Sequence, residues 1–351
     1  MTPRRAGAAL LGLLLLGLAV ALRAQEPPSP APSPSPRLSP KVAETVITSL
    51  TLFAGTTEGL YRSRDWGSTW EPAIAHRDAH GLEGAGAVRD IMALGPQVYL
   101  AANGGVYVSE DFGENWRRTE TGAPVMRVLP SRYPLSDLTV FAATTAGLMK
   151  STDAGRTFAP TAVTGLGVNR VEWPGPALVL ATSKGVLVSP DSGLTFNAAP
   201  SGLPEGEVRA LALSSFYAAD PVLFAGVGAA GVFRSSDGGK TWEAAGLSGQ
   251  AVTDLAWLGP FLYAVSDTGM YRSEDLGRTW TALTKSVAAA PTRVLFPLMP
   301  ASGMEIFLGT VRGIYRSPDG GLNWQASGLG DLPVLCLGTF PQADPPRGKK
   351  K

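Results

Sequence analysis

The chain has 351 residues, and its 30 lysines and arginines nearly balance its 29 aspartates and glutamates, giving a net charge of +1. A near-neutral chain lacks the basic field that nucleic-acid binding needs, so we expect no nucleic-acid partner. Cys336 is the only cysteine, which excludes an internal disulfide and predicts a buried, unreactive thiol.

Residues 1–24 have the pattern of an export signal. Arg4 and Arg5 precede an apolar run at 6–22 that is short for a membrane-spanning helix, and small residues follow it. We expect cleavage near Ala21 or Ala24, and a bacterial protein that is periplasmic or secreted, with no stable membrane span after signal removal. An uncleaved membrane anchor is the alternative.

The rest of the chain divides by composition into a linker, one domain and a tail. Residues 25–41 are a Pro/Ser-rich linker without the apolar content to pack. Residues 42–340 form a single domain, and 341–351 form a basic, flexible tail.

One short phrase is repeated seven times in the domain. Each copy has the form Ser-x-Asp-x-Gly-x-Thr/Asn-aromatic behind a short apolar strand. The copies span 59–70, 105–116, 147–158, 185–196, 231–242, 269–280 and 313–324. A period near 40 residues with strand-like content predicts a circular or stacked array of small β units.

The chemistry of the phrase is that of a turn. An Asp carboxylate can accept hydrogen bonds from the backbone N–H groups ahead of it, and Gly adopts the positive φ that other residues resist. We therefore interpret the seven aspartates as structural turn formers: Asp65, Asp111, Asp153, Asp191, Asp237, Asp275 and Asp319. The aromatic residue opens the next strand and buries apolar area between units.

The phrase resembles the Asp-box, or BNR repeat, of sialidases, xyloglucanases, sortilin-type receptors and the photosystem II stability/assembly factor family. In those families the box is a hairpin between the third and fourth strands of a propeller blade, away from the binding face. In size, blade number and export signal the chain most resembles the photosystem II stability/assembly factor family. The resemblance implies an exported, non-catalytic propeller that binds a protein partner through a basic patch.

Four strand signals per repeat and seven repeats predict an all-β, seven-bladed propeller of four-stranded blades. Blade 1 starts at about Val46 and has no first strand of its own. The stretch VLCLGTF (334–340) resembles the first strands of the other blades. We expect it to complete blade 1 and close the ring, leaving no sheet edge at the seam.

Three motifs resemble sites of other proteins. GVGAAG (226–231) matches a dinucleotide fingerprint, but a strand follows it where the fingerprint needs a helix, so we interpret it as a blade turn. Asp111-Phe112-Gly113 matches a kinase phrase but belongs to the second box. His76 and His80 flank Asp78 and could ligate a metal if helical, but a solvated loop is the favoured interpretation. We expect no metal and no cofactor.

An alignment of the first strands places five arginines in one register, with Thr253 and Val334 at the two remaining places. The arginines are Arg89, Arg127, Arg170, Arg209 and Arg293. At the channel mouth opposite the boxes they could bind an anionic or glycan ligand or an acidic protein segment. The alternative is structural: each arginine pairs locally with Asp90, Glu172, Glu207 or Asp254.

One expectation follows from this register. Replacing Arg127, Arg170 and Arg209 by Ala should abolish partner capture while leaving thermal unfolding nearly unchanged.

Two aromatic residues of the boxes are a separate candidate site. Trp66 and Phe112 occupy the position after Asp in adjacent boxes. They either form an exposed docking patch or pack locally, and local packing is favoured.

Binding scaffold and hydrolase are the two functional hypotheses. Glycosidases need paired acid and base groups, and sialidases carry an Arg-Ile-Pro phrase that this chain lacks. The loop-face carboxylates show no recognisable pairing: Glu58, Asp78, Glu83, Glu205 and Asp331. We therefore expect no catalytic residues and a monomeric scaffold for a cell-envelope protein, with a sialidase- or xyloglucanase-like glycoside hydrolase as the alternative.

Overall fold

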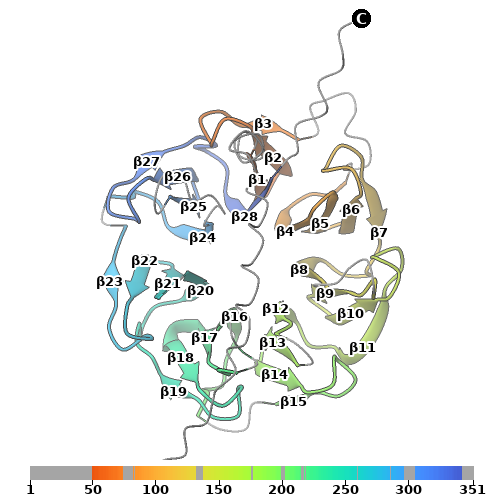
Figure 1. Cartoon of the computed structure of the whole chain (residues 1–351), viewed down its shortest axis with the longest axis vertical. Coiled ribbons are helices and arrows are strands. Elements are labelled where there is room, and N and C mark those ends of the chain that lie inside the picture. The colour runs from red at the N-terminus through yellow and green to blue at the C-terminus, as the bar shows by residue number, and fades with distance from the viewer. Residues whose placement is uncertain are drawn as a thin grey trace, which may run out of the picture. The chain divides into compact units, whose positions relative to one another are not determined.

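The computed structural model of the protein describes residues 50–73, 82, 84–131, 137–174, 177–198, 202–214, 217, 219–258, 260–284, 286–295 and 305–341. These residues form seven four-stranded antiparallel sheets arranged in a ring (Figure 1). The chain is therefore the seven-bladed β-propeller that the repeat predicts. The export signal, the linker, and the tail beyond Pro341 lie outside the described residues.

The strands of each blade run from the channel to the rim in chain order, except in blade 1. The innermost strands are β28 (Val334–Pro341), β4 (Val88–Leu94), β8 (Val125–Pro130), β12 (Val168–Glu172), β16 (Val208–Leu213), β20 (Val252–Leu258) and β24 (Pro291–Leu295). The second strands are β1 (Leu50–Thr56), β5 (Gln97–Ala102), β9 (Val140–Thr144), β13 (Leu178–Thr182), β17 (Leu223–Val227), β21 (Phe261–Ser266) and β25 (Ile306–Thr310). The third strands are β2 (Leu60–Ser63), β6 (Gly105–Ser109), β10 (Gly147–Ser151), β14 (Gly185–Ser189), β18 (Gly231–Ser235), β22 (Gly269–Ser273) and β26 (Gly313–Ser317). The outermost strands are β3 (Glu71–Pro72), β7 (Arg117–Thr119), β11 (Ala159–Thr164), β15 (Asn197–Ala198), β19 (Glu243–Ala244), β23 (Thr281–Ala282) and β27 (Gln325–Ala326).

The hydrophobic core lies between the blades. Second strands such as β9 are buried on both faces, and alternate residues face opposite neighbours. Val140 and Ala142 pack in the cluster shared with blade 2, whereas Phe141 and Ala143 pack in the cluster shared with blade 4. One such cluster occurs at each of the seven blade interfaces in the described part of the chain.

The box aromatics join these interface clusters, as the sequence predicts. Trp70 donates its indole N–H to the Ser327 carbonyl of blade 7 at 2.6 Å, and Trp280 donates to the Ala245 carbonyl of blade 5 at 2.8 Å. The outermost strands begin one residue after the aromatic instead of at it, because the aromatic still belongs to the box turn.

The C-terminal strand closes the ring. Strand β28 pairs antiparallel with β1, from Leu50 opposite Pro341 to Gly55 opposite Cys336, and becomes the innermost strand of blade 1. Gly55 has no space for a side chain, because a Cβ there would collide with Cys336 Sγ and the Val88 carbonyl. The predicted seam therefore exists and is tightly packed.

The one helix among the described residues is the 3₁₀ turn η1 (Gly228–Ala230), which joins β17 to β18. It lies inside the GVGAAG segment and is followed by a strand, so that segment is a blade turn. No helix in the described ranges has the length and apolar character that crossing a membrane requires.

Candidate functional site

The two ends of the channel lie on different faces of the ring. The boxes of blades 2, 3 and 5 contact the connection that follows the innermost strand: Phe112 N–H donates to the Pro96 carbonyl at 2.9 Å, Ala154 N–H to the Leu138 carbonyl at 2.8 Å, and Gly238 N–H to the Pro221 carbonyl at 3.0 Å. The starts of the innermost strands lie with the opposite loops, since Thr145 N–H donates to the Pro124 carbonyl at 3.1 Å. The boxes are thus on the face opposite the strand starts, as predicted.

The box aspartates are bonded within their own hairpins. In every box the Ser hydroxyl donates to one Asp oxygen at 2.7–2.8 Å. That oxygen also accepts the backbone N–H of the Thr or Asn four residues on, whose side chain donates to the second Asp oxygen. These hydrogen bonds stabilise the charged carboxylate, so the side chain and N–H of Thr195 lower the pKa of Asp191 to about 2.

The residue after each Asp also has a left-handed backbone conformation, which the sequence pattern does not predict. Its φ is 59° at Trp66, 61° at Phe112 and 58° at Leu276, and glycine fills the same place at 238 and 320. This backbone orients the two aromatics inward, where Trp66 packs on the cluster between blades 7 and 1, and Phe112 on the cluster between blades 1 and 2. Local packing is therefore the observed state of both rings.

The five arginines do not share one register, which corrects the sequence alignment. Each innermost strand has a bulge directly after its first residue, so its second residue is unpaired. Arg89 and Arg209 are bulge residues, whereas Arg127, Arg170 and Arg293 follow the bulge. The buried Val or Pro before each bulge sets the register of these strands, and the arginines lie at two different positions relative to it.

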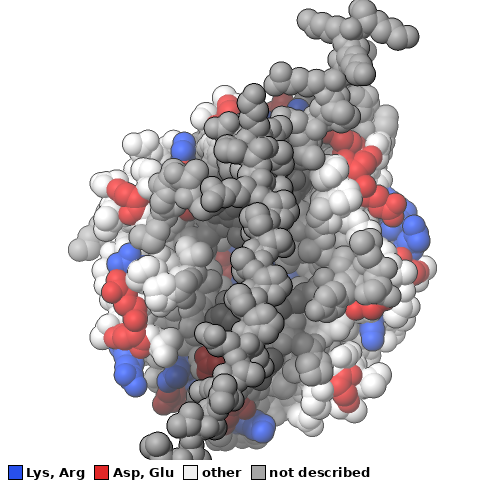
Figure 2. Space-filling model, in the orientation of Figure 1, with Lys and Arg blue, Asp and Glu red and all other residues white. Residues whose placement is uncertain are grey.

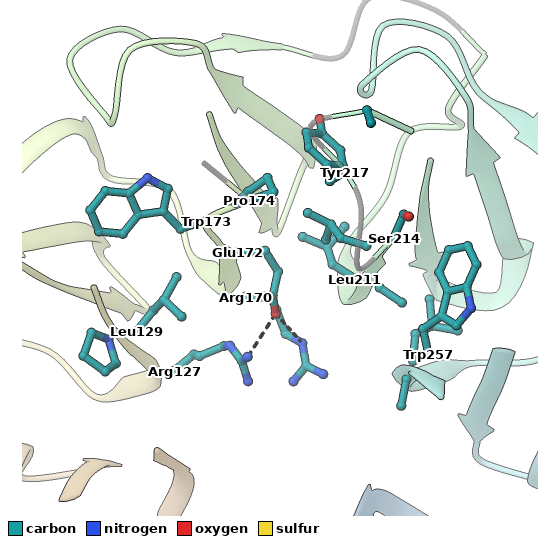
Figure 3. A pocket seen from close by; sticks show the side chains of 16 residues that line it. Arg127, Leu129, Arg170, Glu172, Trp173, Pro174, Leu211, Ser214, Tyr217 and Trp257 are labelled. Carbon is teal, nitrogen blue, oxygen red and sulfur yellow. Dashed lines mark hydrogen bonds and ion pairs between the residues drawn. The ribbon is translucent and has the colours of Figure 1, made fainter. Parts of the chain in front are cut away.

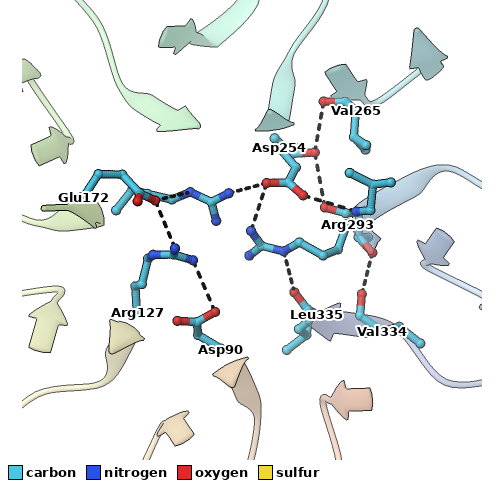
Figure 4. Close-up of polar contacts among 12 residues, drawn as sticks. Asp90, Arg127, Glu172, Asp254, Val265, Arg293, Val334 and Leu335 are labelled. Atoms are coloured by element: carbon cyan, nitrogen blue, oxygen red, sulfur yellow. Dashed lines mark hydrogen bonds and ion pairs between the residues drawn. The ribbon is translucent and has the colours of Figure 1, made fainter. Parts of the chain in front are cut away.

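The three arginines after the bulge form a charged network across the channel (Figure 4). Arg127 donates to Asp90 at 3.4 Å and to Glu172 at 2.9 Å. Arg293 donates to Asp254 Oδ1 at 3.1 Å.

Arg170 completes the network from blade 4. It forms an ion pair with Asp254 of blade 6, and its Nε lies 4.0 Å from Glu172 Oε1. Ala210 of blade 5 and Cys336 of blade 1 occupy the same level without charge. Three guanidiniums thus meet three carboxylates, and the network carries no net charge.

Burial and mutual attraction set the protonation of the network. Burial alone would lower the pKa of Arg127, but attraction to Glu172 and Asp90 raises it above its usual value. Burial, with repulsion from Arg127 and Arg293, lowers the pKa of Arg170 to about 10, so it remains charged at neutral pH. Burial opposes the charge of Asp254, but Arg293 and Arg170 hold its pKa below the usual value.

The seven bulge residues line one cavity of about 380 Å³ at the mouth opposite the boxes. We call this cavity the arginine mouth; it is lined by Arg89, Met126, Asn169, Arg209, Thr253, Thr292 and Leu335, with Arg170, Glu207 and Arg293. Several of these side chains join neighbouring blades: Asn169 donates to the Val208 carbonyl at 2.9 Å, and Thr292 donates to the Val334 carbonyl.

The two bulge arginines differ in their partners. Arg209, half exposed, pairs with Glu207 at 2.7 Å. Arg89 donates to Asn103 Oδ1, a neutral group, and burial lowers its pKa. Within the residues that the structure describes, Arg89 is the one arginine of the five without a carboxylate partner.

A larger cavity of about 600 Å³ occupies the other end of the channel (Figure 3). We call it the aromatic cup; it is lined by Arg127, Leu129, Pro130, Arg170, Glu172, Trp173, Pro174, Leu211, Ala212, Leu213, Ser214, Tyr217, Ala219, Leu255, Ala256 and Trp257. The sequence interpretation missed it. One signal was available: Trp173 and Trp257 both lie five residues after the buried Val that precedes the bulge.

The remaining candidate residues lie apart from both cavities or outside the described residues. His76, His80, Asp78 and Glu83 are outside them. Glu58, Glu205 and Asp331 are described and exposed. In the described part of the chain, no three His, Cys, Asp or Glu side chains are placed to hold a metal ion.

Cys336 is buried, as predicted, at the level of the network. Its thiol lies 3.7 Å from the Val88 carbonyl, to which it can donate. Burial, with the nearby charge of Asp90, raises its pKa to about 12. The thiol is therefore protonated at neutral pH.

Comparisons with known proteins agree with this architecture. A family model described as BNR/Asp-box repeat matches residues 233–244, which overlap most of the fifth copy of the phrase. No curated protein matches the chain significantly. The chain is a seven-bladed β-propeller that carries BNR/Asp-box repeats.

Solved structures of two functional kinds share the fold. The GH74 xyloglucanase from Xanthomonas campestris is 16% identical with a TM-score of 0.64, over 80% of this chain and 52% of that one. YCF48 from Cyanidioschyzon merolae is 16% identical with a TM-score of 0.54, over 75% and 93%. A YCF48 bound to D1 peptide is 17% identical with a TM-score of 0.53, over 68% and 81%. The chain spans about half of the xyloglucanase and 36% of an ancestral GH74 enzyme. At these identities the likeness establishes the propeller scaffold.

Proposed function

We propose that the chain is an exported, non-catalytic propeller that holds an acidic segment of a protein partner at the arginine mouth. Arg89 carries the proposal, because it is a partly buried guanidinium at the mouth whose described partner is neutral. A carboxylate or phosphate group there would form a charge-assisted hydrogen bond and offset the cost of burying the charge.

The surroundings of Arg89 favour an anion over a cation. The mouth and the network below it together contain five arginines and four carboxylates among the described residues. The excess positive charge lies at the mouth. Elsewhere charges of both signs are interspersed on the face shown in Figure 2. The likeness to a YCF48 with a bound peptide is consistent with peptide capture on this fold.

The test is binding of an Asp/Glu-rich peptide to the full chain, measured by calorimetry at two salt concentrations. Arg89→Ala with Arg209→Ala should weaken binding by roughly tenfold or more, because a charge-assisted hydrogen bond contributes about 1.5–3 kcal/mol. Arg278→Ala with Lys240→Ala also removes two positive charges, both at exposed box positions, and should leave binding unchanged. Equal weakening by this control would mean that net charge alone attracts the peptide.

The alternative function is a glycoside hydrolase acting on extracellular glycans, supported by the likeness to GH74 xyloglucanases. Incubation of the purified chain with sialosides and β-glucans tests it directly. Turnover that disappears on replacing Glu58, Glu205 or Asp331 would favour the hydrolase and contradict the non-catalytic proposal.

A further inference from the structure

The aromatic cup lies at the box end of the channel and has no part in the proposed capture of an acidic segment. It is formed by the ends of the innermost strands of blades 3 to 6 and the connections that follow them. Its volume of about 600 Å³ is within the range of small-molecule pockets, about 300–1,000 Å³.

The walls of the cup are aromatic and held in place. Trp173 packs edge-on against Phe141 at 5.3 Å, and Trp257 packs in the same way against Phe224 at 5.6 Å. Both indoles are only partly buried and line the cup, with Tyr217 between them (Figure 3). The negative faces of such rings attract the polarised C–H groups of a ligand as well as apolar surface.

The floor of the cup is polar, and its charges are already paired. Two guanidiniums and one carboxylate line it, those of Arg127, Arg170 and Glu172, and the other members of the network, outside the cup, complete the balance of three guanidiniums and three carboxylates. A charged ligand would compete with these ion pairs, whereas a neutral ligand leaves them intact. The floor therefore favours a neutral ligand.

The unpaired Nε–H of Arg170 indicates which polar group a ligand in the cup would need. Its side chain is 8% exposed, and its Nε–H has no hydrogen-bond partner among the described residues. Glu172 Oε1 is 4.0 Å from this Nε, which is beyond hydrogen-bonding distance. One hydroxyl group between them could accept from Nε and donate to Oε1, whereas a carbonyl or carboxylate can only accept.

The indole of Trp173 offers a second buried donor, since its Nε1–H is also without a partner in the described part of the chain. Buried donors are almost always paired in folded proteins, so a ligand with several oxygens would satisfy both. We propose that the aromatic cup binds a neutral, polyhydroxylated ring, a pyranose, with one hydroxyl bridging Arg170 and Glu172 and the ring against the indoles.

The experiment measures tryptophan fluorescence and calorimetry of the full chain with neutral methyl hexopyranosides, a neutral β-linked tetrasaccharide, glucuronate and glucosamine. A neutral glycoside should bind saturably and more tightly than either charged sugar. Trp257→Ala should weaken that binding at least tenfold, and Trp257→Phe should weaken it less. Tighter binding of the tetrasaccharide would identify a glycan chain as the ligand, and equal binding would identify a single ring.

Two further variants separate the cup from the arginine mouth. Arg209→Ala should leave glycoside binding unchanged, and Trp257→Ala should leave capture of the acidic peptide unchanged. Glu172→Gln keeps an acceptor oxygen but leaves the floor positive, so it should shift preference toward glucuronate. The proposal is overturned if no neutral glycoside binds, if a proline-rich peptide binds at the indoles instead, or if Arg209→Ala abolishes sugar binding while Trp257→Ala does not.

Discussion

Arg170 on β12 pairs with Asp254 on β20 across the channel, past blade 5, which contributes only Ala210 at this level. Asp254 also accepts from Arg293 at 3.1 Å and from Val294 N–H at 3.2 Å. Three blades are therefore joined through one buried carboxylate.

Asp254→Ala should destabilise the ring strongly, because it leaves two guanidiniums without their shared acceptor. Removal of one partner from a buried ion pair costs about 3–5 kcal/mol. Urea unfolding followed by circular dichroism measures the loss. Glu207→Ala breaks the half-exposed pair with Arg209 and should change the free energy of unfolding by less than about 1 kcal/mol.

The same network revises one expectation from the sequence. The triple replacement of Arg127, Arg170 and Arg209 cannot leave thermal unfolding nearly unchanged, because the first two are buried and paired. The double variant at Arg89 and Arg209 is the appropriate probe of the mouth, since neither residue belongs to the network.

Acid should destabilise the propeller between about pH 4 and pH 2. The pKa of Asp275 is lowered to about 2 by the hydroxyl and N–H of Thr279 and by Ser273, and Asp153, Asp191 and Asp237 have similar values. A carboxyl whose folded pKa is lowered contributes stability above its unfolded pKa and loses it as pH falls through the folded value. The melting temperature should be constant from pH 7 to 5 and fall below pH 4.

Thr279→Val tests the cause of this shift at one box. It removes the hydroxyl that donates to Asp275 Oδ2 at 2.7 Å, while the backbone bond remains. Carboxyl NMR titration should show a higher pKa for Asp275 and unchanged values for Asp153 and Asp191. An unaltered pKa of Asp275 would assign the shift to the backbone N–H groups and the Ser273 hydroxyl.

The seam where β28 pairs with β1 and packs against Val88 of blade 2 should tolerate no added carbon. Gly55→Ala places a Cβ against Cys336 Sγ and the Val88 carbonyl, so we expect a loss of about 1–3 kcal/mol in denaturant unfolding. Gly330→Ala meets nothing within 4 Å and serves as the control, with an expected change within about 0.5 kcal/mol.

Cys336 reports directly on opening of that seam. A thiol reagent should not label it in native conditions, because it is 1% exposed and its pKa is raised to about 12. Ser68→Cys adds a thiol at an exposed box position and should label at once, giving a fast and a very slow phase in one protein. Fast labelling of both would show that the seam opens readily.

The sequence predicts the scaffold better than the channel. Local rules place each box, since Asp153 and Gly155 act within one hairpin, and the apolar stretch around Cys336 marks the closing strand. The channel depends on residues far apart in sequence, such as Arg170 and Asp254, whose pairing requires the ring geometry. The repeated bulge is a backbone feature that side-chain identity does not show, so the sequence does not reveal that Arg89 lies one residue before the register of Arg127.

The closing pair of strands also determines how the molecule could be mounted. Leu50 and Pro341 are paired at the box end of blade 1, so the first and last residues of the described ring lie at the same face. A support or fused protein joined directly at either residue would therefore be anchored on the side of the hairpins. The guanidinium-lined opening lies on the side of the ring opposite that anchor point.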